Sequence, residues 1–228
     1  MLRRSAVVIG IVAGVLVIPS VAGAKAAKKP PKQVPTLTAK AAPSPVVFGQ
    51  STVVSGRLSG TPKDGGQTVA LQSDPFPYDG LFIAGPTTMT AANGNYVFTP
   101  VKPDRNTQYR VRETTGAMLT SNVVLVGVRL SVTFYVSDST PSRGQRIHFS
   151  GSVRPRHDGK LVRIQRRDST GVFRTVATTT TYHPKGKTYS RYSKYLRVNS
   201  DGVYQVRVSA SDSDHYSGVS RTRFLNVP

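Results

Sequence analysis

The chain has 228 residues, is 38% hydrophobic and carries 31 Lys and Arg against 11 Asp and Glu, which gives a formal net charge of +20 at pH 7. This apolar fraction is enough for one or two small cores and too low for a membrane-embedded protein. Gly (20) and Pro (16) are frequent, while Cys and Trp are absent. The composition indicates many turns and few long helices, and it excludes disulfide bonds and lipids attached through Cys.

Residues 1–24 have the pattern of a secretory signal peptide. A positive start at Arg3 and Arg4 is followed by an apolar stretch, and Ala22-Gly23-Ala24 offers small residues for cleavage. The alternative is an uncleaved N-terminal anchor, because residues 6–24 contain no charge. In both cases we expect the remaining chain to be secreted or to lie at the exterior of the cell envelope, with no transmembrane domain beyond this segment.

Residues 25–36 are rich in Lys, Ala and Pro and contain almost no large apolar side chains. Such a segment cannot bury enough surface to offset the entropy of ordering, so it is predicted to be a flexible basic tail.

Alternating apolar residues predict a series of β-strands over residues 37–128. A strong hairpin signal, Asn93-Gly94, separates two of the strands, and residues 123–128 close the domain. The side chains expected to point inward are Thr52, Val54, Leu58, Val69, Leu71, Tyr96, Phe98, Tyr109 and Val111.

The same plan returns over residues 129–228 at a spacing of 95 residues. Gly144-Gln145 repeats Gly49-Gln50, and Tyr204 repeats Tyr109. The residues Ile147, Phe149, Gly151 and Val153 stand at the same offset from Thr52, Val54, Gly56 and Leu58. A period with drift confined to the turns is typical of duplicated modules, so the sequence predicts two copies of one β-domain.

The run Asp201-x-x-Tyr204-x-Val206 resembles the tyrosine corner of immunoglobulin-like domains, with Val in place of Cys. Together with the repeated Gly-Gln, Ser-Gly and Val-x-Leu/Ile-Gln motifs, it makes the chain similar to the immunoglobulin-like or fibronectin-III-like tandem repeats of bacterial secreted and surface proteins. The resemblance implies an all-β protein of two tandem antiparallel β-sandwiches. It also implies a buried Tyr whose hydroxyl bonds the backbone upstream, with Val111 and Val206 filling the space of the missing Cys pair.

No catalytic, cofactor or metal site is predicted. The chain has only four His residues, His148, His157, His183 and His215, and their spacing lacks any pairing typical of metal ligands. We expect all four to be solvent-facing polar residues. The acidic run Asp212-Ser213-Asp214 lacks the Gly and Glu that complete a calcium loop, so an ordinary turn is the simpler interpretation.

Positive charge is concentrated in the second copy. Residues 129–228 hold 18 Lys and Arg against 6 Asp and Glu, a net charge of +12, whereas residues 35–128 hold 7 against 5. In immunoglobulin-like sandwiches the third and sixth strands are neighbours and the last strand lies beside them, which predicts an outer sheet face lined with Arg. The residues proposed to bind polyanions there are Arg163, Arg167, Arg207, Arg221 and Arg223.

A second candidate surface is an aromatic and cationic strand in which Tyr189, Arg191, Tyr195 and Arg197 share one parity. Such residues can stack on sugars or bases while pairing with anions. A plain solvated basic exterior is the competing explanation for both surfaces.

The sequence thus predicts an exported, non-enzymatic structural or adhesive module, monomeric and without a cofactor. Its partner would be an anionic envelope polymer or polysaccharide, with extracellular nucleic acid as a further polyanion. The alternative is a carbohydrate-binding accessory module that uses Tyr189, Tyr195 and the loop of Phe76 and Tyr78 for stacking.

Overall fold

A computed structural model describes residues 33–210 and 214–228. The predicted signal peptide 1–24 and residues 25–32 of the predicted tail lie outside the described residues. Residues 33–35 are not in a strand, and the first strand, β1 (Thr36–Ala42), begins at the last residue assigned to that tail. The described part of the chain contains no helix with the length and apolar character needed to cross a membrane.

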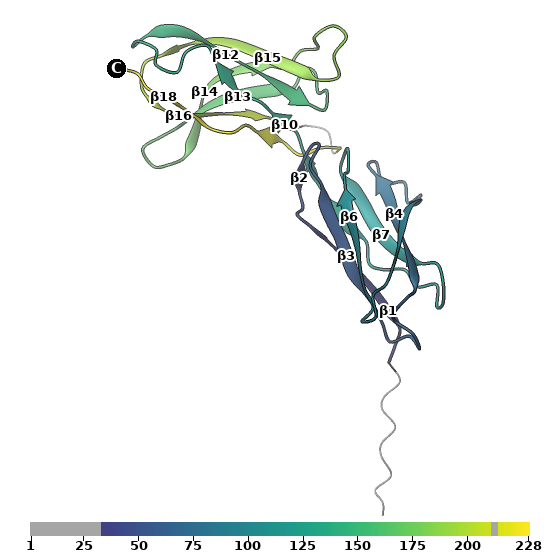
Figure 1. Ribbon diagram of the computed structural model, residues 1–228. Coiled ribbons are helices and arrows are strands. Elements are labelled where there is room, and N and C mark those ends of the chain that lie inside the picture. Colours follow the sequence, from purple (N-terminus) through teal and green to yellow (C-terminus); the bar gives the residue numbers. More distant parts are fainter. Residues whose placement is uncertain (1–32, 211–213) are drawn as a thin grey trace, which may run out of the picture. The chain divides into compact units, whose positions relative to one another are not determined.

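Every element in the described residues is a β-strand, as the sequence predicted. In the first copy, one antiparallel sheet has the order β1-β3-β6 and the other the order β5-β4-β7-β8 (Figure 1). The bounds are β3 Thr52–Ser59, β4 Thr68–Pro75, β5 Ile83–Met89, β6 Asn95–Val101, β7 Thr107–Glu113 and β8 Val124–Val126. The short strand β2 (Val46–Val47) pairs in parallel with β9 (Val128–Arg129).

The second copy has the same two layers. In one sheet, β12 pairs with β15 along one edge and with β10 and β11 along the other; the second sheet has the order β14-β13-β16, and β17 and β18 pair with successive parts of β16. The bounds are β10 Ser131–Val132, β11 Tyr135–Val136, β12 Gln145–Arg154, β13 Leu161–Arg167, β14 Phe173–Thr180, β15 Ser190–Val198, β16 Gly202–Val208, β17 Gly218–Val219 and β18 Arg223–Leu225.

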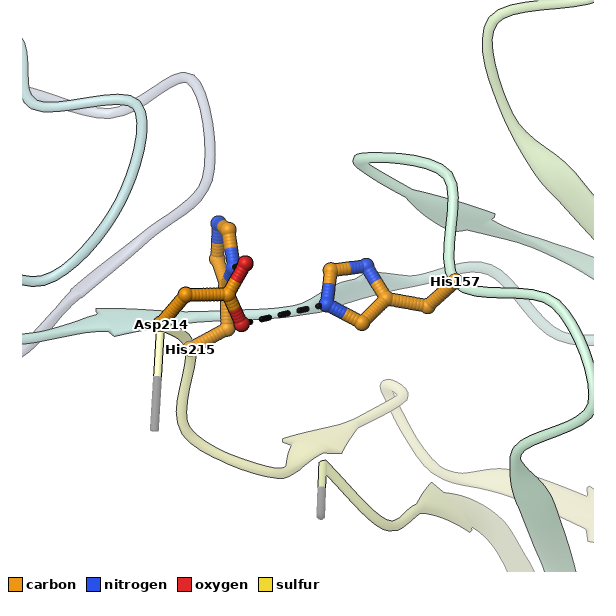
Figure 2. A group of neighbouring side chains, drawn as sticks. All are labelled: His157, Asp214 and His215. Atoms are coloured by element: carbon orange, nitrogen blue, oxygen red, sulfur yellow. Dashed lines mark ion pairs between the residues drawn. The ribbon is translucent and has the colours of Figure 1, made fainter. Parts of the chain in front are cut away.

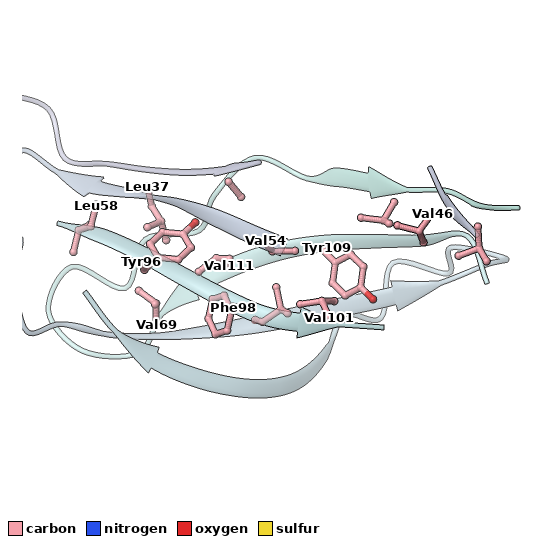
Figure 3. Packing of buried hydrophobic residues seen from close by; sticks show 14 residues of the cluster. Leu37, Val46, Val54, Leu58, Val69, Tyr96, Phe98, Val101, Tyr109 and Val111 are labelled. Atoms are coloured by element: carbon pink, nitrogen blue, oxygen red, sulfur yellow. The ribbon is translucent and has the colours of Figure 1, made fainter. Parts of the chain in front are cut away.

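The first core lies between the two sheets and is built from alternate residues of each strand (Figure 3). All nine side chains predicted to point inward are buried, from Thr52 on β3 to Val111 on β7. Each fully buried Val, Leu or Phe side chain stabilises the fold by about 1.5–3 kcal/mol relative to exposure. Tyr109 closes one end of this core, and burial raises the pKa of its hydroxyl to about 12.

The second core repeats this packing with larger rings. Phe149 stacks on Phe134 with ring centroids 5.7 Å apart, and it also contacts Tyr204 at 5.9 Å. The hydroxyl of Tyr204 donates to the backbone carbonyl of Ser200 at 3.3 Å, which is the upstream bond that the resemblance implied. Val111 and Val206 are both fully buried, as the resemblance implied.

A second pair of buried tyrosines shows that the duplication extends to individual hydrogen bonds. Tyr96 donates its hydroxyl to the carbonyl of Thr38, and Tyr192 donates to the carbonyl of Thr133 at 2.7 Å. In each sheet, this bond links the strand at one edge, β6 or β15, to the segment at the other edge, across the central strand β3 or β12. Because burial disfavours the phenolate, it raises the pKa of both hydroxyls well above the ordinary value.

Candidate functional site

The outer face of β12 and β15 is the surface on which cationic and aromatic side chains gather. The inward residues of β12 and β15 include Ile147, Phe149, Tyr192 and Val198, which fixes the alternate residues as outward. Four outward pairs stand directly opposite each other across the two strands: Arg146 and Arg197, His148 and Tyr195, Ser150 and Ser193, and Ser152 and Arg191.

The centre of this face is a stack of three side chains. The ring of His148 lies on the ring of Tyr195 with centroids 4.7 Å apart and an interplanar angle of 25°. The guanidinium of Arg146 lies 4.8 Å from the centroid of the same Tyr195 ring. His148 Nε2 is 2.7 Å from Ser193 Oγ, and the Tyr195 residue remains 54% exposed. These contacts hold the half-exposed tyrosine in one orientation.

The other predicted residues of this strand extend the face in both directions. Arg191 and Arg197 are exposed, and Arg197 Nη1 donates to the carbonyl of Gly144 at 3.0 Å. Tyr189 precedes β15 and is only half-buried, with the guanidinium of Arg154 at 5.0 Å from its ring centroid. The sequences of β12 and β15 contain no Asp or Glu, so the cations on this face lack a carboxylate partner within the two strands.

Lys194 explains a mismatch in the sequence pattern. It has the parity of the core residues but is exposed, because β15 is the edge strand of its sheet. A long side chain at such an edge can carry its ammonium group into water while its stem covers apolar surface.

The predicted arginine face on the other sheet is assembled only in part. Arg163 and Arg207 stand directly opposite each other on β13 and β16, and Arg163 Nη1 donates to Ser209 Oγ at 2.5 Å. Arg167 lies at the exposed end of β13, with its guanidinium 5.5 Å from the ring centroid of Phe173.

The remaining two arginines do not join that face, and the prediction was wrong for them. Arg223 pairs in register with the buried Tyr204, so its side chain leaves the sheet on the opposite side from Arg207. Its Nε donates to the carbonyl of Phe134 at 2.8 Å. Arg221 precedes β18, and both Arg221 and Arg223 line a groove beside residues 131–135. The physical reason is the short length of β17 and β18, which leaves no continuous last strand to carry both residues outward.

The sheet of β13 and β16 has an acidic residue beside it that pairs with one of its arginines. Asp168 follows β13, accepts a hydrogen bond from Thr170 Oγ1 at 2.6 Å and pairs with Arg174 Nε at 3.0 Å. These contacts hold the pKa of the Asp168 carboxyl below its ordinary value, and the hydrogen bond from Thr170 has the largest effect. Like β12 and β15, the strands β13 and β16 contain no Asp or Glu, so the face of β12 and β15 is distinguished by the ordered Tyr195 between its arginines.

Two histidines expected to face solvent are instead buried. His157 and His215 are 7% and 5% exposed, and both lie beside the carboxylate of Asp214 (Figure 2). The sequence pattern missed this cluster because its members lie in two loops, 157 after β12 and 214–215 after β16. The available signal was the predicted pairing of β13 with β16, which brings those loops to one end of the sandwich. Asp212 and Ser213 of the acidic run lie outside the described residues.

The loop of Phe76 and Tyr78 does not present a flat stacking surface. The two rings pack edge to face with centroids 5.5 Å apart, and both residues are half-buried. Burial raises the pKa of the Tyr78 hydroxyl.

No protein-family model matches the chain, and no curated protein matches it either. Among solved structures, a tetra-tandem repeat in the extending region of a large adhesion protein is similar over 84% of this chain and 49% of that chain, with 20% identity and a TM-score of 0.35. Red sea bream transglutaminase is similar over 86% of this chain and 32% of that chain, with 14% identity and a TM-score of 0.40. The chain thus spans less than half of either structure, and neither similarity bears on its function.

Proposed function

We propose that this chain is an exported, non-enzymatic module of the cell exterior, and that its second sandwich binds anionic polymers through the outer face of β12 and β15. Export follows from the predicted signal peptide. The first sandwich packs three strands against four. The second packs four against five, because its two outer strands are each divided into short pieces, β10 with β11 and β17 with β18. Both arrangements support an immunoglobulin-like or fibronectin-III-like type.

The observation that carries this proposal is the row of cations around an ordered tyrosine. Arg146, Arg191 and Arg197 share one face with Tyr195, and β12 and β15 contain no carboxylate. Neutralising successive anionic groups would release counterions, which is the main source of affinity for a polyanion. The Tyr195 ring adds a stacking surface for a sugar or base.

The dimensions of the face favour an extended ligand over a small one. Outward residues of a strand recur about every 7 Å, so Arg191 and Arg197 lie roughly 20 Å apart along β15. A ligand that contacts both must be a chain of several units. An envelope polysaccharide, a polymer of phosphate groups and a single-stranded nucleic acid all satisfy this condition.

The second candidate function is binding of a neutral carbohydrate. It is favoured by Tyr135 on β11, which stands opposite Ser150 on the outer side of the same sheet and is 56% exposed. Tyr135 and Tyr195 would then be the stacking platform, and the arginines would only orient them.

Two charge-matched double variants test the proposal. Arg146→Glu with Arg197→Glu reverses the proposed face, and Arg163→Glu with Arg207→Glu reverses the same number of charges on the other sheet. Immobilised heparin, polyphosphate and single-stranded DNA serve as anionic probes, and a neutral glucan serves as the uncharged one. We expect wild-type affinity for the anionic probes to fall linearly with salt on a logarithmic plot.

The first variant should lose at least tenfold in affinity and show a shallower salt dependence, while the second should stay within about twofold of wild type. Equal losses in both variants would mean that net charge, and not this face, is responsible. Salt-insensitive binding of the neutral glucan that disappears in Tyr195→Ala would favour the carbohydrate alternative.

A further inference from the structure

The cluster of His157, Asp214 and His215 brings three metal-ligating groups to one point (Figure 2). His157 Nε2 lies 3.6 Å from Asp214 Oδ1, and His215 Nδ1 lies 3.2 Å from Asp214 Oδ2. One ligand atom from each residue falls within 4.8 Å of the others. The two imidazole rings stand nearly perpendicular, at 85°, with centroids 4.8 Å apart.

Backbone carbonyls set the tautomer of both rings. A carbonyl oxygen only accepts, so His215 Nε2, which lies 2.7 Å from Asp104 O, is the nitrogen that carries the proton. In the same way, His157 Nδ1 donates to Pro155 O at 3.3 Å. The neutral form of His215 therefore directs the lone pair of Nδ1 at the carboxylate of Asp214, and Nε2 of His157 faces the same carboxylate. Metal-bound histidines have this arrangement, with the second ring nitrogen held by a carbonyl or carboxylate.

Two atoms of the cluster are left without a hydrogen bond. Asp214 Oδ1 and His215 Nδ1 are buried side-chain atoms with no hydrogen-bond partner. The His215 residue is only 5% exposed, and its unpartnered nitrogen points into the cluster. Because an unsatisfied buried polar atom costs free energy, a cation between the rings and the carboxylate would remove an unfavourable arrangement.

The backbone that carries the three side chains is itself fixed. His157 N donates to Ser190 Oγ at 2.8 Å, and His157 O accepts from Thr181 Oγ1 at 2.5 Å. Asp214 O accepts from Asn106 N at 2.7 Å. The donors of the cluster are thus held in place by hydrogen bonds outside it, as a preformed site requires.

From this geometry we propose that His157, Asp214 and His215 bind a divalent transition-metal ion of the zinc class. Two imidazole nitrogens and one carboxylate oxygen suit zinc and exclude calcium and magnesium, which prefer oxygen ligands. Bonds of about 2.0–2.1 Å in a tetrahedral site separate ligand atoms by roughly 3.4 Å. The two rings approach different oxygens of Asp214, at 3.6 and 3.2 Å, and one ligand atom from each residue lies within 4.8 Å of the others, so a small movement of the side chains would close the site on the ion. Three protein ligands leave a fourth position for water or another group.

Such an ion would tie the loop after β12 to the loop after β16. The chain has no Cys and therefore no disulfide that could do so. The inference is independent of polymer binding, because none of the three residues belongs to β12 or β15.

The test is calorimetric titration of the untagged full chain with ZnCl2. We expect one ion to bind per chain. His157→Asn keeps a donor for the carbonyl of Pro155, and His215→Gln keeps a donor for the carbonyl of Asp104, so each removes the ligand atom and keeps that donor. Each variant should lower the affinity at least tenfold, whereas the control His183→Gln, at an exposed position, should not change it.

Imidazole ¹H–¹⁵N spectra of the wild-type chain provide a second measurement that does not depend on the variants folding. Addition of ZnCl2 should shift the signals of His157 and His215 and leave those of His148 and His183 in place. The proposal is overturned if the wild-type chain shows no saturable binding, if the two variants bind as well as wild type, or if other histidines shift. Two doubly protonated rings that ignore zinc would also overturn it and leave a plain ion pair with Asp214.

Discussion

The hydroxyl of Tyr192 makes a single hydrogen bond that holds an edge strand in place. The residue is fully buried, and its hydroxyl donates to Thr133 O at 2.7 Å. This hydrogen bond lies against Gly151, where an added Cβ would overlap both the Thr133 carbonyl and the Tyr192 hydroxyl. This explains why Gly occupies a strand position with ordinary backbone angles: the hydrogen bond occupies the space of a side chain.

We predict that Tyr192→Phe lowers the free energy of unfolding by about 1–2 kcal/mol, because it leaves the carbonyl of Thr133 without its buried donor. The matched change Tyr195→Phe removes the hydroxyl of an exposed residue on the same strand and should cost less than about 0.5 kcal/mol. Urea unfolding of both variants provides the comparison. Equal losses would show that the buried hydroxyl of Tyr192 contributes no more to stability than the exposed hydroxyl of Tyr195.

For single residues, the sequence predicted which strand side chains are buried better than it predicted which groups they contact. The period of two identified Tyr109 and Tyr204 as inward residues, and both are buried. The tyrosine pair Tyr96 and Tyr192 went unmatched because its spacing is 96 residues, one more than the period of the other positions. The burial of His157 and His215 was missed, because loop residues have no periodicity that reports the direction of a side chain; the predicted pairing of β13 with β16 indicated only that their loops meet.

On β13 and β16, two arginines face each other across neighbouring strands. Arg163 and Arg207 are a directly opposed pair, and like charges in that position destabilise a sheet. We predict that Arg207→Glu raises the free energy of unfolding by roughly 0.2–1 kcal/mol at low salt, because it replaces repulsion with an ion pair. The gain should shrink in 0.5 M NaCl as the charges are screened.

The control is Arg207→Gln, which removes the repulsion without adding an attraction and should show an intermediate effect. Denaturant midpoints at two salt concentrations measure both variants. A gain that persists unchanged at high salt would mean that packing, and not charge, is responsible.

The pairing of β13 with β16 was predictable from the resemblance to immunoglobulin-like sandwiches. The register of the last strand was not. Arg223 was expected beside Arg207, but β17 and β18 are separate short strands, and the break between them changes which side each residue faces. A shift of one residue moves every following side chain to the opposite face, so a sequence pattern cannot fix the face of such short strands. The longer strand β15 followed its pattern closely, and Arg191, Tyr195 and Arg197 share one face as expected.

The whole described chain has two hydrophobic cores with no residue in common, one ending with Val128 and the other starting with Leu130. Matched valines lie at the centre of each: Val111 and Val206 are both fully buried. Their amides donate to Ser121 Oγ at 2.9 Å and Ser220 Oγ at 3.0 Å. The same substitution of valine can therefore be made in an equivalent environment in each of the two sandwiches.

We predict that Val111→Ala and Val206→Ala each lower the stability of one sandwich by about 2 kcal/mol, since each removes two methyl groups from a packed core. Calorimetry of the full chain should show two transitions, with a different one shifted in each variant, because the two cores share no residue. This result would support the predicted division into residues 37–128 and 129–228. A single transition that both variants shift equally would instead mean that the hydrogen bonds linking the two copies, such as that from Asn106 N to Asp214 O, make the whole chain one cooperative unit.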